Sequence, residues 1–185
     1  MEPYSIPKNC NFDEIIRRGF GRDGSGQKDD TSCTPIINDV NFLGIVINAP
    51  KKIDIYGPDQ GENKTAFPVS GVIAHDLGLD LGGKGYQHLT NLMIIVIIDA
   101  HTNEVWHGRI PQMDHRIPPP PPKNGPKKPL THEEMKGRII EEVFNPNLLS
   151  ITNMELRETE YLVYATLGPY KSNVASVQAK KKSAR

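Results

Sequence analysis

The chain has 185 residues, with 22 lysines and arginines against 22 aspartates and glutamates, so its formal net charge is zero. This balance excludes a histone-like or polybasic protein that is drawn to nucleic acid or anionic membranes by its overall field. Residues of the apolar classes make up 37% of the chain, which is enough for a sizeable core at this length.

The first eleven residues contain no cationic segment followed by an apolar run. This predicts a protein without a cleaved secretory signal, either cytoplasmic or exported by another route. The longest apolar stretch, Leu92 to Ile98, is far shorter than a membrane span. Cys10 and Cys33 would form a disulfide in an oxidising compartment and would stay reduced in the cytosol, so both states are open.

Two short helices are predicted by capping boxes, in which a capping side chain and a Glu three residues later satisfy each other's backbone N–H groups. One begins at Asn11, with Glu14 three residues later. The other begins at Thr131, with Glu134, and is expected to continue to Phe144. A polar, glycine-rich stretch over residues 21–32 predicts a mobile loop between the first helix and the remainder of the chain.

Short β-branched runs separated by Pro, Gly, Asp and Asn predict successive strands. We expect strands in residues 42–49, 52–56, 66–74, 92–100, 104–110, 148–152, 160–167 and 172–179. The run over 92–100 is almost wholly apolar, which predicts burial on both faces. With 104–110 it predicts a hairpin whose turn is Thr102-Asn103. For the core or its edge we expect Ile94, Ile95, Val96, Ile97, Trp106, Leu162 and Tyr164.

Half of the 16 prolines lie in residues 111–129, and five of them are consecutive. Such a segment prefers the extended polyproline form. Because basic residues flank it, it is a candidate ligand for the aromatic grooves of adaptor domains. The alternative is a rigid crossover that covers a sheet edge. The candidate binding residues are Arg116, Pro118, Pro119, Pro120, Pro121, Pro122 and Lys123.

The segment over residues 159–179, TEYLVYATLGPYKSNVASVQA, resembles the final strand pair of fibronectin type III and related immunoglobulin-like sandwiches. The residues that match are Thr159, Tyr161, Val163, Gly168, Ser172 and Asn173. The resemblance implies that Tyr161 forms a corner in which its hydroxyl anchors an upstream backbone group. It implies no catalytic residues, and because the fold hosts many functions it favours binding only by analogy.

Histidines near carboxylates are the candidates for a zinc or iron site. They are His75, His101, His107 and His115. No HExxH or HxH pair occurs among them, so the alternative is that they are surface or loop-end residues. With a turn at Thr102-Asn103, His101 would face Glu104 and His107 would face Ile98, at different heights on the ladder.

Other catalytic patterns are incomplete. Residues 78–85 match G-x-x-x-x-G-K, but Gly85 stands where magnesium binding needs Ser or Thr, which favours an inter-strand loop. No G-x-S-x-G nucleophile motif occurs. Asp76 and Asp99 could form an acid/base pair on residue type alone. A single tryptophan supplies little of the stacking surface that carbohydrate binding uses.

The sequence therefore predicts a mainly β protein, an antiparallel immunoglobulin-like β-sandwich over residues 41–179 with one or two short helices. Residues 1–40 form an N-terminal extension, 111–130 a proline-rich insertion and 180–185 a basic tail. The expected function is a non-enzymatic protein-binding or assembly module without a cofactor. Its partner would be another protein or a second copy, not nucleic acid or membrane. The alternative is a metal-binding protein or metal-dependent hydrolase.

The zero net charge divides along the chain. Residues 1–110 carry 10 basic and 14 acidic groups, a net charge of −4, and residues 111–185 carry 12 and 8, a net charge of +4. This polarity predicts that self-association, where it occurs, is specific in orientation and weakened by salt.

Overall fold

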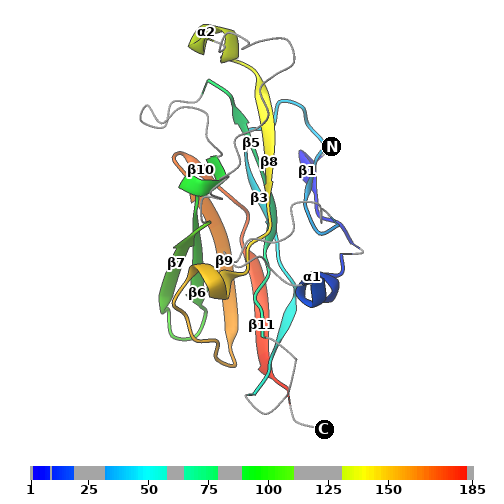
Figure 1. Cartoon of the computed structure of the whole chain (residues 1–185), viewed down its shortest axis with the longest axis vertical. Coiled ribbons are helices and arrows are strands. Elements are labelled where there is room, and N and C mark those ends of the chain that lie inside the picture. The colour runs from blue at the N-terminus through cyan, green and yellow to red at the C-terminus, as the bar shows by residue number, and fades with distance from the viewer. Residues whose placement is uncertain are drawn as a thin grey trace, which may run out of the picture.

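The computed structural model describes residues 2–8, 10–18, 32–57, 65–78, 89–110 and 131–182, and the described part is mainly β (Figure 1). In chain order the elements are β1 (Tyr4–Ser5), α1 (Phe12–Arg18), β2 (Ile36–Ile37), β3 (Gly44–Asn48), β4 (Lys52–Ile55), β5 (Ser70–Asp76), the 3-10 helix η1 (Leu89–Leu92), β6 (Ile94–Asp99), β7 (Val105–Arg109), α2 (His132–Met135), β8 (Ile139–Phe144), α3 (Leu148–Ile151), β9 (Glu160–Leu167), β10 (Tyr170–Lys171) and β11 (Ala175–Lys181). Most of the predicted loop and proline-rich segments lie outside the described residues.

The larger sheet has six strands. Its order is β4-β11-β9-β6-β7, and β10 pairs with β9 beside this path. β4 and β11 are parallel, whereas the other pairs in the sheet are antiparallel. The predicted hairpin is confirmed, because β6 and β7 are adjacent and antiparallel. β9 and β11, which begin and end the segment over residues 159–179, are also antiparallel.

The smaller sheet has three antiparallel strands in the order β3-β5-β8. Ile47 and Ile73 of this sheet belong to the same buried cluster as Ile97 and Val163 of the larger sheet, so the two sheets share one core. Phe144, at the end of β8, joins the same cluster. Burial of this apolar surface between two sheets is the main stabilising contribution to the fold.

The N-terminal segment covers the other face of the smaller sheet. β1 pairs with β2, and Figure 1 shows β1 and α1, in blue, beside β3, β5 and β8 and away from β6 and β7. The Thr34 hydroxyl lies 3.1 Å from the Ser70 hydroxyl, which points outward from β5. Val46, Val72 and Ala74 also point outward, yet they are completely or almost completely buried. The outward side of β3 and β5 is therefore covered, whereas Val143 of β8, on the same side, is 48% exposed.

An asparagine side chain joins the two sheets at the edge of β3. Asn173 Oδ1 accepts a hydrogen bond from the backbone N–H of Ile47 at 2.9 Å, and Asn173 Nδ2 donates to the Ile47 carbonyl at 3.0 Å. The amide thus satisfies a donor and an acceptor that a neighbouring strand would otherwise pair. Asn173 precedes β11, so this contact also holds the larger sheet against the smaller one.

The capping boxes begin helices as predicted, but the second helix is far shorter. At α1, Glu14 N–H donates to Asn11 Oδ1 at 3.3 Å. At α2, Thr131 N–H donates to a Glu134 carboxylate oxygen at 2.7 Å, and Glu134 N–H donates to the Thr131 hydroxyl. Gly137 then adopts φ +79°, which ends the helix, so the prediction of a helix to residue 144 is wrong.

Residues 139–144 form strand β8 instead. Every residue from Ile139 to Phe144 is paired with β5, from Asp76 back to Gly71. The apolar positions of this segment suit one face of a helix, but β-branched residues also suit a strand, and pairing with a buried strand decides between them. The predicted strand over residues 148–152 is also wrong. Asn147 Oδ1 accepts from Leu149 N–H at 3.3 Å and caps the helical turn α3.

The apolar strand β6 is not buried on both faces as predicted. Ile95 and Ile97 point into the core and have no exposed surface, whereas Ile94, Val96 and Ile98 are half-buried on the opposite face. β6 lies inside an antiparallel sheet, and such sheets commonly bury a single face. The described residues therefore leave the second apolar face of this strand only partly covered.

The predicted core residues of β9 are also on the outer face. Tyr161 and Val163 are fully buried in the shared core, whereas Leu162 and Tyr164 alternate with them and are half-buried on the outside. Successive side chains of a strand point to opposite faces. Assigning one residue to the wrong face therefore exchanges the predicted inner and outer residues of the entire strand. Trp106, by contrast, packs against the core as predicted.

The β6–β7 hairpin has a four-residue loop rather than the predicted two-residue turn. Asp99 N–H donates to the Glu104 carbonyl at 3.0 Å, and Val96 is paired with His107. Asp99 Oδ1 stabilises the loop by accepting a hydrogen bond from the backbone N–H of His101 at 2.8 Å. Asn103 adopts a left-handed backbone conformation in the loop, with φ of +59°. The prediction that His107 faces Ile98 is therefore wrong by two residues.

Candidate functional site

The three predicted metal-binding histidines that the structure describes lie apart from one another. His75 lies in β5 of the smaller sheet, His101 in the loop after β6, and His107 on the outer side of β7. His101 Nδ1 lies 3.0 Å from the Thr159 hydroxyl. Among the described ranges, no group of three or more His, Cys, Asp or Glu residues is placed to hold a metal ion. His115 lies outside the described residues.

His75 and Glu142 form a buried polar clamp. His75 is 3% exposed, which differs from the surface position that the sequence suggested as the alternative to metal binding. Its Nε2 lies 3.2 Å from Glu142 Oε1 and its Nδ1 lies 3.0 Å from the Asp76 carbonyl. An ionised carboxylate and a carbonyl oxygen can only accept, so the two contacts together favour the imidazolium form, in which both ring nitrogens donate.

The same carboxylate fixes η1 against β8. Glu142 Oε1 accepts from the backbone N–H of Leu89 at 3.1 Å, and Glu142 Oε2 accepts from the Thr90 hydroxyl at 3.4 Å. Burial acts to lower the pKa of His75, but the bonds to Glu142 and Asp76 outweigh it and raise the pKa above its ordinary value. Burial acts to raise the pKa of Glu142, but the bonds from His75 and Leu89 hold it low.

The clamp does not have the arrangement of a catalytic triad. In a triad the imidazole lies between a carboxylate and the attacking hydroxyl. Here Glu142 lies between His75 and the Thr90 hydroxyl, so the base does not contact the hydroxyl that it would have to activate. The clamp therefore serves to join β5, β8 and η1.

The candidate acid/base pair is divided between two separate networks. Asp76 accepts from the backbone N–H groups of Gly78 at 2.7 Å and Gly137 at 2.9 Å in the smaller sheet. Asp99, in the larger sheet, accepts from the hairpin loop and from the Thr159 hydroxyl at 3.0 Å. Burial acts to raise the pKa of Asp99, but these bonds outweigh it and lower the pKa. Both carboxylates thus hold loops in place.

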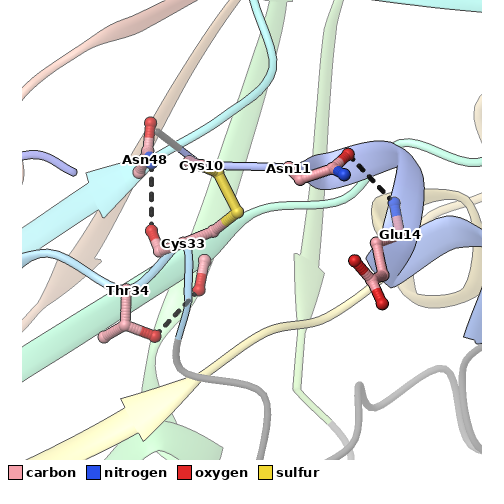
Figure 2. Close-up of a disulfide and its surroundings, with 7 residues drawn as sticks. Cys10, Asn11, Glu14, Cys33, Thr34 and Asn48 are labelled. Atoms are coloured by element: carbon pink, nitrogen blue, oxygen red, sulfur yellow. Dashed lines mark hydrogen bonds between the residues drawn. A yellow bond between two sulfur atoms is a disulfide. The ribbon is translucent and has the colours of Figure 1, made fainter. Parts of the chain in front are cut away.

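Cys10 and Cys33 are joined by a disulfide, with their Cα atoms 4.8 Å apart (Figure 2). The Cys33 side chain is fully buried, and it packs with Phe12 and Ile15 of α1. The Cys33 carbonyl accepts from Asn48 Nδ2 at 3.0 Å, at the end of β3. Of the two states left open by the sequence, the structure contains the bonded one, and the bond holds the start of α1 beside the smaller sheet.

Tyr161 forms the predicted corner. Its hydroxyl oxygen accepts from the backbone N–H of Arg157 at 2.8 Å, and the hydroxyl donates to the Arg157 carbonyl at 3.3 Å. The Tyr161 ring is fully buried and packs edge-on against Trp106. Burial raises the pKa of this phenol above its ordinary value. The corner fixes the chain where it enters β9.

The outer side of the larger sheet carries an apolar face. It consists of outward-pointing residues on three adjacent strands, namely Ile94, Val96, Ile98, Val105, Leu162 and Tyr164. The isoleucines of β6 lie at its centre, with Val105 of β7 on one side and the β9 residues on the other. Val105 is 55% exposed, and the others are half-buried. We call this surface the apolar face.

Sequence reasoning missed this surface, although two signals could have found it. The T-x-Y-x-V pattern already assigned Tyr161 and Val163 to one side of β9, which leaves Leu162 and Tyr164 on the other. The uninterrupted apolar run of β6 had the same implication, because an antiparallel strand commonly has one face directed away from the core. The predicted proline-rich binding residues, from Arg116 to Lys123, lie outside the described residues.

Neither the protein-family models, nor the curated proteins, nor the solved structures contain a match to this chain. Of the helices in the described ranges, none has the length and apolar character that crossing a membrane requires. The function must therefore be argued from the surfaces and contacts above.

Proposed function

We propose that the chain is an immunoglobulin-like β-sandwich that works as a non-enzymatic protein-binding or assembly module. The single observation that carries the binding function is the apolar face of the larger sheet. Six apolar side chains on three adjacent strands point away from the core, and the described part of the chain leaves them partly exposed. Large contiguous apolar patches on a protein surface mark interaction sites.

The topology supports the sandwich. An order of β4-β11-β9-β6-β7 in one sheet and β3-β5-β8 in the other agrees with the two-sheet arrangement of immunoglobulin-like folds, in which the last strand lies beside the strand that carries the tyrosine corner. The Tyr161 corner at the entrance to β9 is a second feature of that arrangement. These features concern the fold, and the binding function depends on the apolar face.

The two outward faces of the sheets differ. On the smaller sheet, the N-terminal segment lies over the outward side of β3 and β5, so that Val46 and Val72 are buried there, although Val143 of β8 is 48% exposed on the same side. On the larger sheet, Ile98 and Leu162 are paired neighbours in comparable positions, yet they remain half-buried. Because the chain covers the outward valines of β3 and β5 with its own residues, we infer that a partner covers the apolar face of the larger sheet.

The chemistry of the apolar face suits a protein partner. Aliphatic side chains gain from contact with other apolar groups, whereas phosphates of nucleic acid need clustered cations. Tyr164 adds an amphipathic ring of the kind that is enriched at protein interfaces. The disulfide between Cys10 and Cys33 further supports an oxidising compartment as the place where this binding occurs.

The test uses two variants of the full chain as bait in extract of its own source. The first combines Ile98→Thr with Leu162→Thr, which keeps two strand-compatible side chains but makes the centre of the apolar face polar. The matched control is Val143→Thr, which changes an outward residue of β8 that is 48% exposed. We expect the double variant to lose proteins that the native chain and the control both recover.

Equal recovery by all three baits would contradict binding through the apolar face. Thermal melts followed by circular dichroism establish that both variants are folded. A further bait that lacks residues 116–129 tests whether the proline-rich segment contributes a separate contact.

A further inference from the structure

We infer that the disulfide between Cys10 and Cys33 is a redox latch, that is, a bond whose reduction by a dithiol frees α1 and uncovers the Cys33 thiol while both sheets stay folded. The inference concerns a different part of the molecule from the apolar face, and it does not depend on the proposed binding function. It rests on the unequal exposure of the two cysteines, on the attachment of Cys33 to the smaller sheet and on the contacts that hold α1.

The two cysteines are exposed to different extents. The Cys33 side chain has no exposed surface, whereas Cys10 is half-buried. A thiolate breaks a disulfide by attacking one of its sulfur atoms, and the other sulfur leaves. The attack falls on Cys10 Sγ, because Cys10 is the residue of this pair that solvent reaches. Cys33 Sγ is then the leaving group.

The reaction exchanges one disulfide for another. One thiolate of the dithiol forms a bond with Cys10 Sγ while the bond between Cys10 and Cys33 breaks, and Cys33 leaves as a thiolate that takes up a proton. The second thiolate of the dithiol attacks its own partner sulfur in the mixed disulfide, and Cys10 leaves in the same way. Both cysteines become thiols, and the dithiol, which supplies the two electrons, becomes a disulfide.

The Cys33 side of the bond is attached to the smaller sheet. The Cys33 carbonyl accepts a hydrogen bond from Asn48 Nδ2 at the end of β3, as Figure 2 shows. The next residue, Thr34, is buried, and its hydroxyl lies 3.1 Å from the Ser70 hydroxyl of β5. These contacts do not involve the sulfur atoms. Cys33 therefore keeps its position on the sheet when the bond is broken.

The buried apolar contacts of α1 centre on the disulfide. Phe12 and Ile15 are 8% and 4% exposed, and they form a cluster with Cys33, against which Cys10 packs. This cluster is separate from the core that the two sheets share. Within the described ranges, it contains no residue of either sheet. The covalent bond is therefore the main link between α1 and the body of the protein.

α1 is too short to remain ordered by itself. It has seven residues, and isolated helices shorter than about 12–15 residues are marginal in water. The cap at Asn11 satisfies a backbone N–H at the start of the helix only. Burial of the Phe12 and Ile15 side chains offsets the conformational entropy of only a few ordered residues. Once the bond is reduced, α1 therefore leaves the surface of the protein and unfolds.

β1 is held by other contacts. It pairs with β2, and the Pro3 carbonyl accepts from the backbone N–H of Asn38 at 2.9 Å. The ring of Tyr4 packs edge-on against that of Phe42, with the ring centres 5.9 Å apart. These contacts involve neither α1 nor the sulfur atoms. Reduction therefore frees α1 and leaves β1 in place.

Thiol labelling of the purified full chain tests the latch, because Cys10 and Cys33 are its only cysteines. The chain is treated with dithiothreitol in native buffer, desalted and reacted with a maleimide, and mass spectrometry counts and locates the labels. We expect no label before reduction and two labels after it. Cys33 should react within about tenfold of its rate in the reduced chain in urea, since local opening exposes it. Slower reaction of Cys33 would overturn the inference.

The rate of reduction shows whether the bond opens in the folded protein. Attack at Cys10 should be proportional to the dithiothreitol concentration and nearly independent of urea below the unfolding transition. A rate that rises with urea in step with global unfolding would show that the bond is reduced only in the unfolded chain, and the latch would be excluded.

Hydrogen exchange followed by mass spectrometry locates the structural change. After reduction, we expect the peptide that contains α1 to exchange at least about tenfold faster, whereas peptides from β5 and β9 should keep their native rates. Cys10→Ser should show the same pattern without reductant, and dithiothreitol should then have no further effect, which controls for the reagent. An α1 that stays protected after reduction, or exchange that accelerates throughout both sheets, would contradict the inference.

Discussion

The amide side chain of Asn173 takes the place of a neighbouring strand for Ile47, with one accepted and one donated hydrogen bond at 2.9 and 3.0 Å. Exposed strand edges invite pairing with other chains, and a side chain that occupies the backbone groups of an edge prevents it. Asn173 lies between β10 and β11 of the larger sheet, and Ile47 lies in β3 of the smaller one, so the same contact sets the relative position of the two sheets at this edge.

Asn173→Asp should destabilise the fold by roughly 2 kcal/mol, because a carboxylate keeps the acceptor but opposes its charge to the Ile47 carbonyl. The free energy of unfolding from chemical denaturation measures this loss. Asn153→Asp, which makes the same chemical change at an exposed site, should stay within about 0.5 kcal/mol of the native value. Equal effects at the two sites would show that Asn173 does not close the edge.

Tyr161→Phe should cost roughly 1–2 kcal/mol of stability, since it leaves the backbone groups of Arg157 without the buried hydroxyl that pairs them. The matched control is Tyr164→Phe, on the outer face of the same strand, where the ring contact with Lys171 is retained. Denaturant titration of the two variants gives the comparison. A Tyr164 variant as unstable as the Tyr161 variant would argue against the corner.

The clamp between His75 and Glu142 gives stability a defined dependence on pH. The folded-state pKa of His75 is raised, so its contribution is complete below the ordinary value of 6.5 and is lost as the pH rises through the folded value. The folded-state pKa of Glu142 is lowered, so its contribution is complete above 4.5 and is lost as the pH falls through the folded value. The clamp therefore contributes most between these two pH values.

We expect the native chain to lose the stabilisation that His75 contributes as the pH rises from 5.5 to 8.5, because the folded-state pKa of His75 is raised. His75→Gln should be less stable at pH 5.5 and should lack this part of the pH dependence. His101→Gln, at an exposed loop position, should keep the native slope. Parallel pH profiles for the native chain and the His75 variant would disprove the assignment.

Breaking the disulfide should lower stability by about 3 kcal/mol, in line with the closure of a loop of this length. The variant combines Cys10→Ser with Cys33→Ala, because the Cys33 position is fully buried. Thermal melts of the native chain with and without reductant should differ, and reductant should have no effect on the variant. A native melt that does not respond to complete reduction, verified by mass spectrometry of labelled thiols, would contradict this prediction.

The sequence was informative where local chemistry decides the structure. Asn11 and Thr131 begin helices because their side chains satisfy the first N–H groups, and that depends only on residues three positions away. The β6–β7 hairpin and the tyrosine corner were likewise predicted from short patterns. Contacts between residues distant in sequence were beyond such reasoning, as the pairing of His75 with Glu142 illustrates.

The errors have a common physical cause. Residues 139–144 can form either an apolar helix face or a strand, and only the neighbouring β5 determines which. In β9, Leu162 and Tyr164 were assigned to the core because they are as apolar as Tyr161 and Val163. Composition alone therefore does not identify which side of the strand faces the core. The apolar face was not predicted for the same reason. An uninterrupted apolar run such as that of β6 is expected both for a strand buried on two faces and for a strand with one face at a binding surface.

The bond between Cys10 and Cys33 also changes the covalent connectivity of the chain. Residues 10–33 form a closed ring, so a single proteolytic cut within it yields two polypeptides that remain one molecule. Such a nick would be invisible on a denaturing gel without reductant and would appear as two fragments once reductant is added. The polypeptide that contains the first strand, β1, would stay attached to the sheets it covers until its sulfur–sulfur bond was broken.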